Sequence, residues 1–138
     1  EPASRSRTPV RKRKRKKHYI ADDSVVSRIV SLGNLGDPSV IPELISFTGS
    51  DNGNERRMAA SALGKLAKFK PVIFKSVEAL EVLLADDKPQ VRQYAMRALE
   101  KIGVINCIEI ERIINNPDEE DYNVTIANRL ITKEKKTS

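Results

Sequence analysis

The chain has 138 residues, which suits one small domain, and its composition excludes several classes of protein. Aromatic residues make up 4% and Trp is absent, so a core must be built from Ala, Leu, Ile and Val, which favours packed helices. No apolar run approaches the roughly 20 residues of a membrane-spanning helix, and a single cysteine, Cys107, excludes an internal disulfide and favours a reducing, intracellular setting. Because residue 1 is Glu, we expect a fragment of a longer protein.

The net charge of +6 is concentrated at the N-terminus. Residues 1–20 hold nine Lys or Arg residues and one acid, whereas residues 21–138 hold sixteen and eighteen. We predict a disordered basic tail over residues 1–21, because its like charges repel one another. Seven consecutive bases favour contact with nucleic acid or an acidic partner, a nuclear import signal, or a plain linker. They are Arg11, Lys12, Arg13, Lys14, Arg15, Lys16 and Lys17.

Apolar residues spaced three and four apart predict helices in the rest of the chain. A first helix begins after Asp22 and ends at Gly36, and Asp37 with Pro38 then begins its partner. The second pair is expected over residues 55–68 and 71–85.

A third pair is expected from Pro89 to Gly103 and around residues 105–115. Asn116 followed by Pro117 and three acids predicts the start of a last, capping helix. The folded domain is therefore expected over residues 22–132, with a frayed end at 133–138.

The helical segments repeat in sequence. ERRMAASALGKL, at residues 55–66, returns as VRQYAMRALEKI at residues 91–102, and an earlier copy is VVSRIVSLGNL at residues 25–35. Units of about this length stack into solenoids. We therefore predict an all-α solenoid of about three antiparallel helix pairs and a capping helix, with Gly33 and Gly64 allowing close approach between helices.

The pattern V-R-x-x-A-x-x-A-L-x-x-I-G at residues 91–103 resembles a HEAT repeat, and is similar to the short HEAT-like repeats of phycobilin lyase subunits. The resemblance covers about residues 24–131 and implies a right-handed stack of antiparallel helix pairs. It also implies a ladder of Asp–Arg pairs between neighbouring units. The ladder arginines would be Arg56 and Arg92, and the acids would come from Asp51, Asp87 or Asp121.

The resemblance further implies that the second helix of each pair lines a concave face. In this chain those helices carry more acids than bases: Glu43, Glu78, Glu81, Glu109 and Glu111 against Lys75 and Arg112. A concave groove for nucleic acid is therefore not indicated, and the first helices are the better candidate for a secondary basic face. Its expected residues are Arg56, Arg57, Arg92 and Arg97.

The sequence offers no catalytic constellation. His18, the only histidine, lies in the tail, and Cys107 is expected to be a buried thiol in an apolar helix. One His and one Cys cannot supply the usual four zinc ligands, and LGNLG at residues 32–36 follows a helix rather than a strand, which argues against a phosphate loop. We predict no catalytic residues, no metal site and no cofactor.

These observations favour a non-catalytic scaffold for protein–protein interaction, an accessory module of a larger intracellular protein that is at most a non-catalytic domain of an enzyme. The alternative is a nucleic-acid-associated module, such as the terminal domain of a helicase, repair or chromatin protein, with the tail on phosphate. A lyase-like subunit that handles a tetrapyrrole rests on family analogy alone. The expected location is cytoplasmic, or nuclear if the basic run is an import signal, with no membrane partner.

Overall fold

The computed structural model describes residues 23–137, so the predictions for the tail, its basic run Arg11 to Lys17 and His18 fall outside the described residues. The described part contains seven α-helices and two short 3₁₀ helices, with no strand between residues 23 and 137. The elements are α1 (Asp23–Leu35), η2 (Pro38–Val40), α2 (Ile41–Phe47), α3 (Gly53–Lys65), η3 (Val72–Ser76), α4 (Val77–Leu83), α5 (Pro89–Ile102), α6 (Cys107–Asn115) and α7 (Asp121–Thr137). The predicted all-α class is confirmed.

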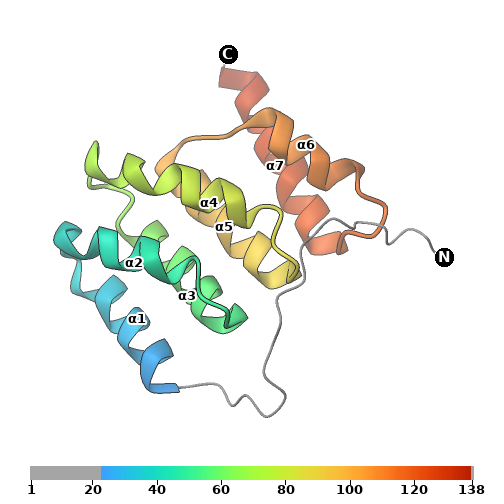
Figure 1. The fold of residues 1–138 in the computed structure, drawn as a ribbon. Coiled ribbons are helices and arrows are strands. Elements are labelled where there is room, and N and C mark those ends of the chain that lie inside the picture. Colours follow the sequence, from blue (N-terminus) through green and yellow to red (C-terminus); the bar gives the residue numbers. More distant parts are fainter. Residues whose placement is uncertain (1–22, 138) are drawn as a thin grey trace, which may run out of the picture.

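The helices form two layers (Figure 1). The first-helix layer consists of α1, α3, α5 and α7, and each of these helices packs on the next. The second-helix layer consists of α2, α4 and α6, which pack on α3, α5 and α7 respectively. Each pair is therefore completed by the first helix of the following unit, as expected when one unit cannot bury its apolar side alone.

One continuous core of aliphatic residues runs between the layers. Its largest members include Ile29, Leu44, Leu63, Leu99 and Ile110, all of which are buried. Within one helix the buried residues recur at helical spacing, as Ile29 and Leu32 do in α1, because only one side of each helix faces the core. Alanines fill the points where helices of the first layer approach most closely.

Short polar signals begin and end the helices. Asp37 accepts a hydrogen bond from the Ser39 N–H at 2.9 Å and begins η2, and Asn52 accepts from the Asn54 N–H at 2.7 Å and begins α3. Each side chain satisfies an N–H that has no partner within its helix. Gly36 and Gly103 follow α1 and α5 with φ of 70° and 92°, a conformation that suits glycine.

The start of the last helix was predicted incorrectly. Asn116 follows α6, its side chain accepts a hydrogen bond from the Asp118 N–H at 2.9 Å, and α7 begins only at Asp121. The reason is tertiary: Glu119 turns inward to bind Arg92, so the residues between the helices form a turn instead of a first helical turn.

Two other boundaries also differ from the expectation. The segment expected as one helix over residues 71–85 is divided into η3 and α4. Helix α7 continues to Thr137, past the expected boundary at residue 132. Basic side chains in its last turn favour the negative end of the helix, and Lys133 binds Glu100 at 3.2 Å, so the extra turns have partners.

Candidate functional site

The part of the chain that the structure describes contains no group of three or more His, Cys, Asp or Glu residues that could hold a metal ion. Within residues 23–137, no helix has the length and apolar character needed to cross a membrane. Cys107 is a free thiol at the first position of α6 and is half-buried, because the helix end leaves it beside solvent. The thiol expected to be buried is thus only partly so, although it packs against the core.

The most organised polar feature is a buried pair between Arg56 and Asp86. Arg56 on α3 is fully buried, and its Nε and Nη2 donate to the two carboxylate oxygens of Asp86 at 2.7 and 3.0 Å. Nη2 also reaches Asp87 at 3.2 Å, and Nη1 donates to the Ser50 carbonyl at 2.9 Å. One guanidinium thus joins the loop before α3 to the loop before α5, with the two-pronged geometry that Arg favours for carboxylates.

Arg92 repeats this arrangement one unit later. Its Nε and Nη2 donate to the carboxylate of Glu119, both at 2.8 Å, and Nη1 donates to the Asp86 carbonyl at 2.7 Å. Glu119 also accepts a hydrogen bond from the Asn123 amide at 2.9 Å. Burial alone would raise the pKa of Glu119, but the bonds from Arg92 and Asn123 outweigh it and lower the pKa below its usual value.

The comparisons agree with this stacked arrangement. The family model described as the HEAT-like repeat matches residues 53–102, from the first residue of α3 to the last of α5. Residues 53–102 are thus similar to a HEAT-like repeat segment. No curated protein matches the chain. HEAT repeats are generally non-catalytic scaffold elements and often mediate protein interaction through their surfaces.

The predicted ladder has partners that the sequence did not fully identify. Arg56 and Arg92 lie between units, but their main acids are Asp86 and Glu119, with Asp87 a second partner of Arg56. The other proposed acids, Asp51 and Asp121, are exposed, in the loop before α3 and at the start of α7. The acids lie in runs of adjacent acidic residues, and sequence spacing alone does not show which acid of a run points inward and binds the arginine. Asn123, fully buried, carried no sequence signal.

The predicted basic face therefore needs a correction. Arg56 and Arg92 are 0% and 7% exposed and are occupied by carboxylates, so they cannot contribute to an exposed surface. Arg57 is half-buried and Arg97 is exposed, and both remain on the first-helix layer. Exposed lysines Lys65 and Lys101 lie on the same two helices, so this HEAT unit does present positive charge to solvent.

A groove of about 320 Å³ lies between α3 and α5 of the matched HEAT segment. Its lining includes Ser61 from α3, and Gln93, Tyr94, Arg97 and Lys101 from α5. The Arg57 guanidinium lies over the Tyr94 ring, 5.4 Å from its centre.

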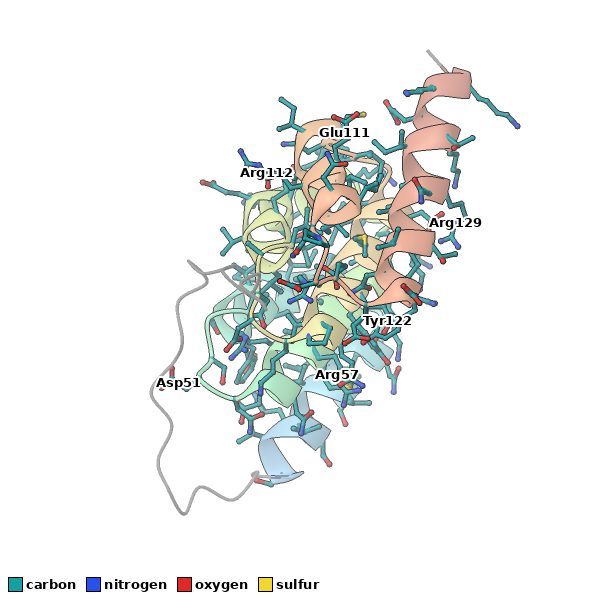
Figure 2. All side chains as sticks on the ribbon, turned by 90° about the vertical axis from the view of Figure 1, so that its right-hand side faces the viewer. Asp51, Arg57, Glu111, Arg112, Tyr122 and Arg129 are labelled. Carbon is teal, nitrogen blue, oxygen red and sulfur yellow. The ribbon has the colours of Figure 1, made fainter. Side chains whose placement is uncertain are left out.

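The second-helix layer, α2, α4 and α6, carries different side chains. Its helices carry the acids expected from the sequence, and Val82 on α4 and Ile108 on α6 are 68% and 66% exposed. Figure 2 shows Arg112 projecting from α6 on one side of the molecule and Arg129 from α7 on the other. The two layers thus differ in charge: the second-helix layer is acidic, and the first-helix layer has the groove with its cations, while exposed apolar side chains occur on both, since Leu35 of α1 is 67% exposed.

Proposed function

We propose that this chain is a non-catalytic HEAT-repeat scaffold that binds a protein partner, as an accessory module of a larger intracellular protein. The observation that carries the proposal is the pair of exposed aliphatic side chains, Val82 and Ile108, on the acidic second-helix layer. Large aliphatic residues with two thirds of their surface in water are sites where a partner gains free energy by covering them. The lone cysteine, Cys107, supports a reducing compartment.

The test compares two variants of equal charge change in the full chain. A partner captured with the wild-type protein is purified, and its affinity is measured by calorimetry for V82D/I108D and for T125D/N128D, which alters exposed residues of α7. We expect the first variant to lose about tenfold or more in affinity, because two apolar contacts of an interface core are replaced by charges. We expect the α7 variant to stay within about twofold, since it lies outside the proposed surface. Equal loss in both variants, or no protein partner at all, would refute this surface.

The basic tail supports a second candidate function, association with nucleic acid. Seven consecutive bases from Arg11 to Lys17 would neutralise phosphates and release counterions. Binding of a DNA duplex should then weaken linearly as log salt rises, and should vanish when residues 1–20 are deleted. DNA binding that survives both changes would assign it to the helical body, and absence of binding at low salt would leave the scaffold proposal alone.

A further inference from the structure

The groove between α3 and α5 is formed by small residues. Ala60, Gly64 and Ala98 make its floor. A Cβ added to Gly64 would lie 3.3 Å from the Ala98 Cα, so the two helices are already close at this point. Larger side chains of α5, among them Tyr94 and Arg97, also line the space. The result is a shallow channel along the helices, large enough for a few side chains of a ligand.

The charges of the groove are uncompensated. Arg97 and Lys101 are one helical turn apart on α5, both are exposed, and neither has a partner among residues 23–137. No Asp or Glu contributes to the lining. Two exposed arginines elsewhere in the described residues are paired: Arg28 binds Glu43 at 2.6 Å, and Arg129 binds Glu100 at 2.7 Å. Arg97 and Lys101 therefore present two positive charges to the groove without a carboxylate in its lining.

Neutral polar groups complete the lining. Ser61 on α3 and Gln93 on α5 face the same space as the two cations. A hydroxyl and a side-chain amide can both donate and accept hydrogen bonds, as the main chain of a peptide requires. The combination of cations, an amide and a hydroxyl along a narrow channel matches an extended peptide that carries carboxylates.

We infer that the α3–α5 groove binds an acidic segment of a partner protein, with its carboxylates on Arg97 and Lys101 and its main chain on Gln93 and Ser61. The inference names the partner chemistry for a second surface and rests on the proposed scaffold function. It places the contact on the first-helix layer, away from Val82 and Ile108, so one partner can engage both surfaces or two partners can bind at once.

Nucleic acid fits the groove less well than an acidic peptide. Single strands gain most of their sequence-tolerant affinity by stacking bases on open aromatic rings. Tyr94 is the only aromatic side chain in the lining described, and one of its faces is covered by the Arg57 guanidinium at 5.4 Å. A space of about 320 Å³ also admits a few side chains but not the width of a duplex.

The test is an NMR titration of the full chain with an octaglutamate peptide. We expect shifts of backbone amides to cluster at Ser61, Gln93, Arg97 and Lys101. We expect R97E/K101E to reduce affinity about tenfold or more, since two ion pairs become repulsive contacts. The matched control K75E/K136E changes the charge equally at exposed sites outside the groove and should stay within about twofold.

A neutral variant separates the groove from general surface charge. Ser61→Phe places a ring in the channel without altering any charge, and should also reduce affinity about tenfold while retaining cooperative melting. Wild-type affinity in S61F would overturn the inference, as would shifts confined to Arg11 to Lys17. A dodecathymidine that shifts the same groove amides at least as strongly would overturn it in favour of nucleic acid. None of these results touches the Val82 surface, so the scaffold proposal is judged separately.

Discussion

The first and last junctions of the stack are held together in different ways. Between α1 and α3, Gly33 packs so closely that an added Cβ would lie 2.7 Å from the Ala62 Cβ. Between α5 and α7, the position equivalent to Gly33 is Glu100, which instead reaches outward to Arg129 at 2.7 Å and Lys133 at 3.2 Å. One junction is a close apolar contact, and the other leaves room for a charged side chain.

The buried ladder shows the opposite distribution. The last junction contains the Arg92–Glu119 pair, whereas in α1 the equivalent of the ladder arginine is Val25. Among the junctions within residues 23–137, only the one between α3 and α5 has both features, with Gly64 against Ala98 and Arg56 bound to Asp86. The family match at residues 53–102 spans this junction. Close packing and a buried ion pair are thus alternative ways to hold neighbouring helices of the first layer together, and the junction within the family match has both.

Removal of Glu119 tests the last junction most severely. Glu119→Ala leaves the Arg92 guanidinium buried without its carboxylate, so we expect a loss of about 3–5 kcal/mol in the free energy of unfolding. Urea unfolding followed by circular dichroism measures it. The control is Asp121→Ala, an exposed acid of the same segment, which should cost no more than about 1 kcal/mol. Equal losses in the two variants would mean that the buried pair does not hold α7.

Substitution of Gly33 tests the first junction. Gly33→Val introduces a branched side chain against Ala62, whose backbone Cα would lie 2.9 Å from the new Cβ, so α1 must shift. We expect a cost of about 1–3 kcal/mol, measured by the same unfolding experiment. Glu100→Val at the equivalent position of α5 loses only two partly exposed ion pairs and should cost about 0.2–1 kcal/mol. If E100V cost as much as G33V, the two junctions would not differ in closeness.

Acid should weaken the last junction selectively. Burial alone would raise the pKa of Glu119 and of Glu100, but hydrogen bonds from Arg92 and Asn123, and from Arg129 and Lys133, lower both below the usual value. A carboxyl with a lowered folded pKa stabilises the protein above its unfolded pKa of about 4.3, and the stabilisation is lost as pH falls through the folded pKa.

The measurement is the free energy of unfolding between about pH 6 and pH 3, in the wild type and in E119Q/E100Q. We expect the free energy of unfolding of the double variant to decrease less between about pH 6 and pH 3 than that of the wild type. The difference between the two decreases should be smaller than the loss caused by E119A at neutral pH. Asp37, whose pKa is lowered by hydrogen bonds from Ser39, belongs to the first unit and is exposed, so D37N serves as the control. An unchanged slope in E119Q/E100Q would contradict the assignment.

Much of the fold was predictable, because local rules decided it. The spacing of Ile29 and Leu32 set the buried side of α1, and Gly36 and Gly103 marked helix ends with a conformation that few other residues adopt. The start of α7 was not predictable in the same way. Asn116 and Pro117 form a good helix-start signal, but the bond between Glu119 and Arg92 overrides it, and such a contact between distant residues leaves no local pattern.

The candidate surfaces show the same division. The sequence predicted the ladder arginines, Arg56 and Arg92, but it also placed both on an exposed basic face, where neither lies. The helical repeat does not reveal which cations point into the protein. The groove depends on Gly64 and Ala98 lying side by side, although they are in different helices. The lack of an ion-pair partner for Arg97 among residues 23–137 could not be predicted either, because it depends on the positions of acidic side chains on other helices.

The smallest expected effect is the most discriminating. Gly33→Ala and Gly64→Ala gain the same helix propensity, at most about 1 kcal/mol, since both glycines lie in the last turn of their helices. They differ in space: the new Cβ meets the Ala62 backbone at 2.9 Å in the first case and the Ala98 Cα at 3.3 Å in the second. We expect G64A to stay within about 1 kcal/mol of wild type and G33A to be the less stable. Because the gain in helix propensity is the same in both variants, their difference in unfolding free energy reports only how closely the helices pack. A G33A variant more stable than G64A would mean that α1 and α3 can move apart to accept the added Cβ.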